Sequence, residues 1–473
     1  MILSKSLLKS ISLRALPFAD AASEQLPLGQ LLRLSLFQVS VGMASVMLLG
    51  TLNRVMIVEL SVPAMIVAVM IALPVLSAPF RALLGFRSDT YKSAIGWKRV
   101  PYLWFGSLWQ MGGLAVMPFA LLVLGGDPVH HVPFAGEVLA ALAFLMTGLG
   151  LHMTQTAGLA LAADRATEET RPRVVALLYV MFLVGMGLSA LLIGWLLRDF
   201  EELLLVRVVQ GAALVGLLLN LVALWKQEHV RPMSKAERAA PRPEFKQAWG
   251  ELSDGTRIGR LLFVVFAGTM AFNMQDVLLE PYGGEILGLS VSATTLLTAM
   301  WATGALAGFA LAAKRLGLGA SPHRLAATGC IAGLAAFSAV IFSAPMQSPA
   351  LFYIGASLIG FGGGLFAVAT LTAAMTLPAA NMRGLALGAW GAAQATAAGL
   401  SIAIGGTVRD VVNTQALAGG WGEALISPAT GYSVVYHTEI ALIFLTLIAL
   451  GPLVARSHAS PRTDRIGLAD FPT

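Results

Sequence analysis

The chain has 473 residues, of which 57% are apolar and only 12% are charged. The charged share is about half of the roughly 25% found in soluble globular domains, so the composition excludes a large water-soluble enzyme. The single cysteine, Cys330, excludes an intramolecular disulfide and any metal site built on cysteine pairs. Windows of about 20 residues or more with almost no charge can each cross a hydrocarbon core, and they predict an all-α integral membrane protein.

In chain order, the apolar windows between charged breaks predict twelve transmembrane helices. They lie at 31–52, 62–84, 100–124, 135–162, 174–197, 203–225, 261–279, 291–313, 325–344, 350–377, 385–408 and 434–455. We expect an N-terminal tail at 1–30, six-helix bundles at 31–225 and 261–455, a linker at 226–260 and a C-terminal tail at 456–473. An even number of spans places both tails on the same side of the membrane.

The basic residues indicate which side that is, because short cytoplasmic loops retain an excess of Lys and Arg. With both tails inside, all but four of the 31 basic residues fall on the inner side, the exceptions being Arg54, Arg198, Arg207 and Arg409. Both termini are therefore predicted to be cytoplasmic. Loops beside anionic lipid headgroups then explain the net charge of +6, and nucleic acid is not an expected partner.

A weak internal repeat relates the two predicted halves. Arg173 opens the fifth span and Arg198-Asp199 closes it, while Arg383 opens the eleventh span and Arg409-Asp410 closes it. A duplicated six-helix half produces such a correspondence. Twelve spans in two halves, joined by a basic linker, indicate the major facilitator superfamily fold.

Glycines four residues apart recur within the spans, for example Gly304 with Gly308 and Gly360 with Gly364. Small residues at this spacing let helix backbones approach closely in lipid, so we interpret them as packing positions. The run at 360–364 follows no strand and precedes no Lys-Ser/Thr pair, so no nucleotide cofactor is expected.

The loop after the second span carries a charged motif. Gly85 is followed four residues later by Asp89, and the basic pair Lys98-Arg99 closes the loop. This pattern resembles the major facilitator loop signature, which forms a charge latch between helix ends. The second glycine, Gly96, comes seven residues after Asp89, which is further than in that signature and argues against ordinary transporter gating.

Ionisable and amide side chains within spans are costly in hydrocarbon and are therefore functional candidates. They concentrate in the first, fourth and seventh spans, and the candidates are Asn53, Arg54, His152, Gln155, Gln275, Asp276 and Glu280. Asp276 and Glu280 stand at i and i+4 on one helical face, where they could carry protons or require an arginine partner. Arg54 can equally snorkel to the outer interface, and His437 and Glu439 are interpreted as interfacial.

His152 is the most informative of these residues. A neutral imidazole within a membrane can ligate the magnesium of a chlorophyll, carry protons or hydrogen-bond a neighbouring helix. No second histidine stands at ligand spacing, so a free metal ion is not expected, and the interhelical hydrogen bond is favoured over a cofactor role. No serine elbow, HExxH or Walker sequence is present in the chain, so we do not expect an enzyme.

Several longer strings resemble the PucC/LhaA family, the bacteriochlorophyll-delivery branch of the major facilitator superfamily. They are the stretches at 16–24, 52–60, 86–90, 96–99, 152–164 and 274–284. The resemblance runs from about residue 14 to 455. It implies a protein of the bacterial inner, intracytoplasmic photosynthetic membrane that assists assembly of core or peripheral light-harvesting antenna complexes.

The resemblance also implies bacteriochlorophyll a as the ligand and antenna α and β polypeptides as partners, with the reaction centre, bacteriochlorophyll synthase and membrane lipids as further contacts. Under it, His152 or Gln155 is the expected axial magnesium ligand, and Trp104 and Trp109 are expected macrocycle contacts. The expected polar anchors are Gln275, Asp276, Glu280, Asn53 and Arg54. Two alternatives stay open: a proton-coupled secondary transporter of an apolar small molecule, and a pigment-free scaffold for antenna helices.

Overall fold

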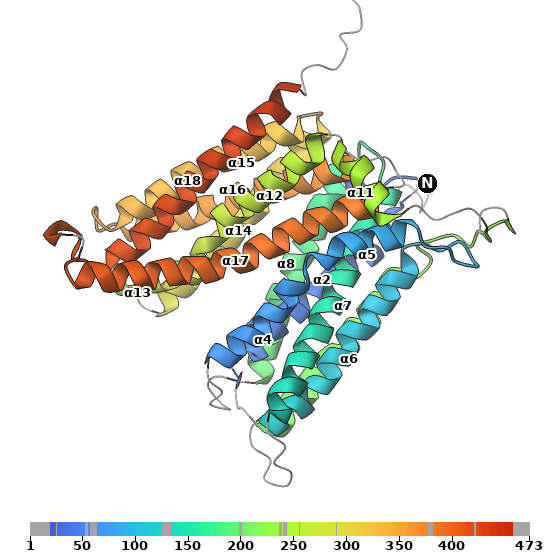
Figure 1. Cartoon of the computed structure of the whole chain (residues 1–473), viewed down its shortest axis with the longest axis horizontal. Helices are drawn as coiled ribbons and strands as arrows, with labels where there is room; N and C mark the ends of the chain where they lie inside the picture. Colours follow the sequence, from blue (N-terminus) through green and yellow to red (C-terminus); the bar gives the residue numbers. More distant parts are fainter. Residues whose placement is uncertain are drawn as a thin grey trace, which may run out of the picture.

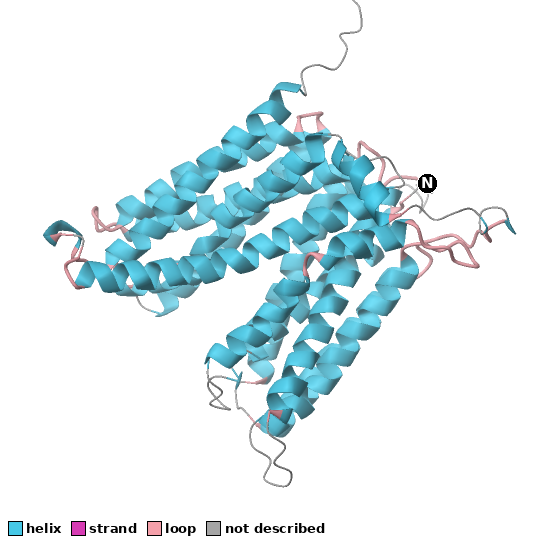
Figure 2. Ribbon diagram, viewed as in Figure 1, coloured by secondary structure: helices cyan, strands magenta, loops and turns pink. Residues whose placement is uncertain are grey.

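A computed structural model describes most of the chain. The described residues are 19–24, 26–52, 55–56, 64–124, 134–197, 201–235, 239, 244–254, 256–289, 291–376, 382–420 and 422–456. Their regular structure is helical throughout both halves of the molecule, and no strand occurs among them (Figure 2). The predicted all-α fold class is confirmed.

The N-terminal bundle contains the helices that precede the polar linker. They are α2 (Leu28–Val46), α4 (Ala64–Ser77), α5 (Phe80–Asp89), α6 (Val100–Leu124), α7 (Ala135–Arg165), α8 (Arg171–Leu196) and α9 (Glu202–Leu224). A π-helical turn, η2 (Met47–Thr51), extends α2. A short 3-10 turn, η1 (Ala19–Ala21), lies before the bundle, and α11 (Phe245–Asp254) follows it within the linker.

The C-terminal bundle begins with a helix that is interrupted near its end. Its elements are α12 (Thr256–Asn273), the 3-10 turn η4 (Met274–Val277), α13 (Leu279–Glu285), α14 (Val291–Gly317), α15 (Pro322–Ser343), α16 (Pro349–Thr376), α17 (Arg383–Leu417), η6 (Glu423–Leu425) and α18 (Ala429–Arg456). The interruption at η4 places polar side chains of the predicted seventh span at a break in the helix.

Eleven helices in the described residues are long and apolar enough to cross a membrane. The predicted second span is not among these eleven, because a turn at Ala78 and Pro79 divides it into the shorter helices α4 and α5. Pro79 has no N–H to donate into a helix, and proline also disfavours the helical conformation of the residue before it. Together α4 and α5 run over 64–89, about 39 Å at 1.5 Å per residue, which is long enough to span.

Close backbone approaches hold neighbouring helices together where glycine was predicted to pack. A Cβ atom added at Gly304 would clash with the carbonyl oxygen of Ser357, and one added at Gly360 would clash with the carbonyl oxygen of Trp301. These contacts join α14 to α16. The packing interpretation of the glycine pairs is therefore confirmed for this helix pair.

The two bundles meet at one end of the molecule and diverge toward the other (Figure 1). At the closed end, α5 packs against the first turns of α17, and α8 packs against α14 and α16. The linker helix α11 lies at this same end (Figure 1). This arrangement leaves the inner faces of the two bundles separated at the opposite end.

Candidate functional site

A cavity of about 230 Å³ lies between α8 of the N-terminal bundle and helices α12, α14, α16 and α17 of the C-terminal bundle. Its wall is largely aromatic. The aromatic lining residues are Tyr179, Phe182, Phe272, Trp301, Phe309, Phe366 and Trp390. Among the described lining residues, Asp276 is the one carboxylate, so the cavity suits an apolar ligand far better than a sugar or an ion.

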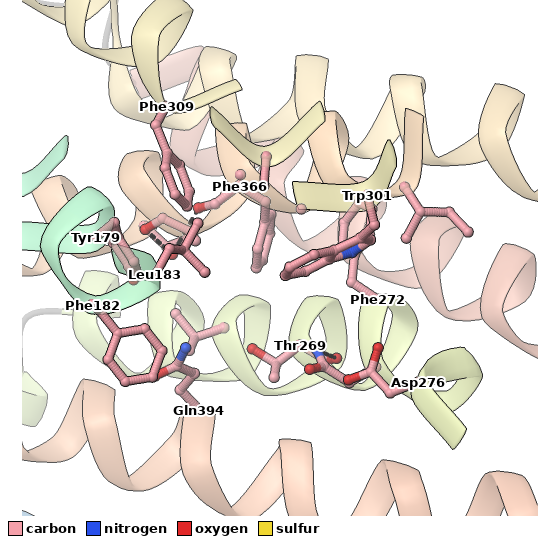
Figure 3. A pocket seen from close by; sticks show the side chains of 18 of the residues that line it. Tyr179, Phe182, Leu183, Thr269, Phe272, Asp276, Trp301, Phe309, Phe366 and Gln394 are labelled. Atoms are coloured by element: carbon pink, nitrogen blue, oxygen red, sulfur yellow. Dashed lines mark hydrogen bonds between the residues drawn. The ribbon is translucent and has the colours of Figure 1, made fainter. Parts of the chain in front are cut away.

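The rings converge from both bundles. Figure 3 shows Phe309, Phe366 and Trp301 projecting toward the space above α12, where Thr269 and Asp276 lie. Across the bundle boundary, the Tyr179 ring on α8 stacks on the Phe309 ring on α14, with centroids 5.2 Å apart and planes at 28°. A change in the spacing of the two bundles would therefore alter the shape of this cavity.

The break in the seventh span positions the polar end of the cavity. In η4 the backbone N–H of Gln275 donates to Oε1 of Glu439 on α18 at 2.8 Å, and the Gln275 amide donates to Oδ1 of Asp276 at 2.5 Å. Glu439 is fully buried and its Oε2 atom has no hydrogen-bond partner. The interfacial interpretation of Glu439 is wrong, because this carboxyl group binds a backbone N–H that the helix break leaves unpaired.

An ionic latch closes the end where the bundles meet. Asp89 at the end of α5 accepts the N–H groups of Gly384 at 3.0 Å and Leu385 at 2.8 Å, at the start of α17. Arg99 pairs with Asp89 and with Asp164, the latter at 3.0 Å. A carboxylate at a helix N-terminus is stabilised by the free N–H groups and the helix dipole. The loop signature predicted such a latch between helix ends, and the structure shows that it joins the two bundles.

Arg81 is a functional candidate that the sequence interpretation missed. It is 2% exposed and lies between the bundles, where its Nε donates to Thr156 Oγ1 at 3.1 Å and its Nη1 donates to the Gly391 carbonyl at 3.3 Å. Its Nη2 atom has no hydrogen-bond partner. The signal was present, because Arg81 falls inside the apolar window at 62–84, where an ionisable residue is a candidate by default.

His152 bridges two helices. Its Nε2 lies 2.9 Å from the Pro74 carbonyl on α4, and its Nδ1 is buried without a partner. The turn at Ala78 redirects the Ala78 N–H to Val75, so the Pro74 carbonyl is free to accept the imidazole N–H. This geometry is the interhelical hydrogen bond favoured from the sequence. His152 as a magnesium ligand stays a prediction; its side chain is 7% exposed and does not line the inter-bundle cavity.

The other predicted site residues are dispersed. Asp276 lines the cavity, and Gln275 touches it only through its hydrogen bond to Asp276. Glu280 on α13 accepts a hydrogen bond from Thr298 Oγ1 at 2.9 Å and does not line the cavity. Gln155, Trp104 and Trp109 also lie outside its lining, and Trp109 is 47% exposed. Asn53 and Arg54 lie outside the described residues. Of the predicted site residues in the seventh span, Asp276 is thus the one that lines the cavity, and most of the aromatic wall comes from other helices.

Comparison with known proteins places the chain in a family. A sequence model described as PUCC protein matches residues 51–458. The chain belongs to the PucC family. Among its PucC-family relatives, a Rhodobacter capsulatus protein of the puhA-bchM intergenic region is 63% identical over the full length of both chains. Protein PucC of Rhodovulum sulfidophilum is 54% identical over 85% of this chain and 89% of its own length.

The fold of this PucC-family chain is similar to that of a solved transporter homologue. The crystal structure of a bacterial homologue of the iron transporter ferroportin, in its outward-facing state, matches with a TM-score of 0.71 and 15% sequence identity. The match covers 90% of this chain and all of the other. It concerns the fold alone, and it confirms the predicted major facilitator architecture of a multi-pass membrane protein.

The cavity fits part of a tetrapyrrole rather than a whole one. Its volume of about 230 Å³ lies below the roughly 300–1,000 Å³ of typical ligand pockets, so it can receive one edge of a flat macrocycle. The buried indole nitrogen of Trp390 lacks a hydrogen-bond partner, and Gln394 lies in the same wall. Both can donate to a carbonyl group on a ligand. No histidine occurs among the described lining residues.

Proposed function

We propose that this chain is an assembly factor for bacterial light-harvesting antenna complexes, core or peripheral, that binds bacteriochlorophyll a and delivers it to antenna α and β polypeptides. The observation that carries the proposal is the aromatic cavity between the bundles, with Asp276 as its one described carboxylate. Membership of the PucC family supports it. The proposal includes no covalent chemistry, so the protein is not an enzyme.

The residues of the cavity have separable roles under this proposal. Trp301 and Phe366 offer flat faces on which a macrocycle edge can stack. The Trp390 indole and the Gln394 amide can orient the ligand by donating to its carbonyl groups. Bound bacteriochlorophyll would supply a magnesium ion, a Lewis acid, and its flat ring would rest on these residues. The latch around Asp89 keeps one end of the bundle interface closed, so exchange with antenna helices occurs from the membrane or from the divergent end.

The family and the charge pattern support the proposed setting. The protein would lie in the inner, intracytoplasmic photosynthetic membrane, with both termini in the cytoplasm. Its neighbours there would be nascent antenna polypeptides, the reaction centre, bacteriochlorophyll synthase and lipids. A factor that receives pigment from its synthase and passes it to apolar antenna helices needs no aqueous transport step.

Gentle purification of the full chain from phototrophic membranes tests the proposal. We expect the absorption spectrum of bacteriochlorophyll and co-purified antenna polypeptides. Trp301→Ala should lower the affinity of the cavity for bacteriochlorophyll up to about tenfold, because an aromatic stacking contact contributes roughly 0.5–1.5 kcal/mol of binding free energy. Trp109→Ala, outside the cavity lining, is the matched control and should leave the pigment content unchanged. Preparations without any pigment would contradict the proposal.

The alternative transporter function has one observation in its favour. Asp276 and the buried Glu439 are joined through Gln275 at a broken helix, and broken helices form coupling sites in secondary transporters. Flux of an apolar solute into proteoliposomes that Asp276→Asn abolishes would establish it and displace the assembly proposal. Antenna polypeptides that co-purify stoichiometrically without pigment would instead support the scaffold alternative.

A further inference from the structure

The last helix, α18, presents an outward-facing stripe that no described element covers. Its members are His437, Ala441, Phe444, Leu445 and Ile448, all exposed, at spacings that place them on one face of the helix. The opposite face packs into the bundle through other residues, Tyr436, Glu439 and Ile443 among them. The stripe spans about 16 Å along the helix at 1.5 Å per residue.

An imidazole on a lipid-facing stripe requires an explanation. Ionisable residues within spans almost always face the bundle interior or a polar cavity, because hydrocarbon offers them no partner. His437 lies near the predicted outer end of the last span, nine residues into α18, and its side chain is exposed. A ligand bound from the membrane would offset the free-energy cost of placing this imidazole against lipid.

The hydrogen bond of His437 determines which nitrogen is available. Nδ1 lies 2.7 Å from the Ser433 carbonyl oxygen, and a carbonyl can only accept, so Nδ1 carries the proton. In the neutral imidazole, Nε2 is then the nitrogen with a free lone pair. In metal-binding histidines, one ring nitrogen typically binds the metal while the other donates to a backbone carbonyl or a carboxylate, which fixes the tautomer and the orientation of the ring.

His437 lines a shallow groove of about 630 Å³, here called the α18 groove. Its lining residues are Leu425, Ser427, Ala429, Thr430, Ser433, Val434, His437, Thr438 and Ala441. Most of these side chains are small, so a flat ligand can approach the helix closely. The Thr430 and Thr438 hydroxyls donate to the carbonyl oxygens of Leu425 and Val434, each at 2.8 Å, and are thus engaged by the backbone.

The side chains that line the α18 groove indicate which kind of metal could bind there, a free cation or a metal held in a ring. No carboxylate lines the groove among the described residues, and no group of three His, Cys, Asp or Glu side chains suited to a metal ion occurs in that part of the chain. A free cation would need several such donors. A metal that already has four ring nitrogens needs one axial ligand, and His437 can supply one.

We propose that the α18 groove is a second pigment site, at which a magnesium tetrapyrrole lies against the lipid-facing side of α18 with His437 Nε2 as its axial ligand. The groove volume falls within the roughly 300–1,000 Å³ of typical ligand pockets, unlike the inter-bundle cavity. The apolar side chains of Phe444, Leu445 and Ile448 continue the stripe and provide a surface for a hydrocarbon tail. The identity of the tetrapyrrole rests on the proposed function.

Titration of the purified full chain in nanodiscs with bacteriochlorophyll a tests this site, with resonance Raman spectroscopy reporting the coordination of magnesium. We expect imidazole-ligated pigment in the unchanged protein. His437→Ala should weaken binding at this site about tenfold or more, since even indirect changes at metal sites cost 10–100-fold, and added imidazole should restore the ligation signal. Ala441→Trp fills the groove without removing the ligand and should also exclude the pigment.

The metal-free ring bacteriopheophytin a is the matched control ligand, because it has no axial position. Its binding should not depend on His437. Imidazole-ligated pigment that persists in both His437→Ala and Ala441→Trp would overturn this inference while leaving the proposed function intact. Absence of pigment from the unchanged protein would instead count against the proposed function. If Ala441→Trp abolished capture of antenna helices without affecting pigment, the groove would be a helix-docking surface and the inference would fail.

Discussion

At the scale of single residues, two buried polar groups of this protein bind backbone atoms that helix breaks have released. The His152 imidazole hydrogen-bonds the Pro74 carbonyl beside the turn between α4 and α5. The Glu439 carboxyl group accepts a hydrogen bond from a backbone N–H of η4. A lone polar residue in a span is therefore ambiguous, because a ligand and an unpaired peptide group require the same side chain. Only the position of the neighbouring helix distinguishes the two.

His152→Ala should lower the free energy of unfolding by about 1 kcal/mol, the usual range for an interhelical hydrogen bond in a membrane protein. The loss is modest because Ser77 Oγ also donates to the Pro74 carbonyl, at 2.7 Å. Thermal or denaturant unfolding in detergent measures it. His437→Ala, which removes an exposed imidazole, is the matched control and should leave stability unchanged. Equal stability of the two variants would count against the structural role of His152.

At the scale of elements, glycine and proline set how the helices meet. Pro79 divides the second span, and glycines allow α5 and α17 to touch at backbone distance. A Cβ atom added at Gly85 would clash with the Gly384 carbonyl, and one added at Gly388 would clash with the Arg81 carbonyl. The closed end of the bundle interface thus depends on the absence of side chains as much as on the charges of the latch.

Gly85→Val should push the bundles apart at this end and cost about 1–3 kcal/mol through overpacking. Spin labels at Arg87→Cys and Lys314→Cys, in a Cys330→Ala background, report the separation of α5 from α14. We expect a longer mean distance in Gly85→Val. The control is Gly211→Val on α9, where nothing lies within 4 Å of the added Cβ atom. The same distance in both variants would refute the role assigned to Gly85.

At the scale of the whole molecule, two bundles joined at one end enclose an aromatic cavity and leave α18 open to the surroundings. The side chains that join the bundles come from predicted cytoplasmic ends of spans, as Asp89, Asp164 and Arg383 show. The predicted orientation and the closed end are therefore linked. If basic loops face the cytoplasm, the bundles are closed toward the cytoplasm and divergent toward the outer side.

Labelling with a membrane-impermeant maleimide checks this orientation. In a Cys330→Ala background, Leu318→Cys follows α14 on the predicted inner side, and Met346→Cys follows α15 on the predicted outer side; both parent side chains are exposed. We expect Leu318→Cys to react in inverted vesicles and Met346→Cys to react in right-side-out spheroplasts. The reverse pattern would show that the termini lie outside and that the latch closes the outer end.

The sequence by itself determined the membrane class, the positions of nearly all spans, the major facilitator architecture and the family. These features depend on local composition, on loop charge and on strings of adjacent residues. It also singled out Asp276 as a candidate, because a charged group is conspicuous in an apolar span, and Asp276 lines the cavity.

Only the tertiary structure decided which rings form the cavity, how Arg81 and Glu439 are buried, and that His437 faces outward. In a span that is apolar on every side, no periodicity distinguishes the face toward the bundle from the face toward lipid. Trp301 and Trp109 therefore look alike in sequence, although one lines the cavity and the other does not. The difference arises from helix packing across the two bundles, which brings together residues far apart in the chain.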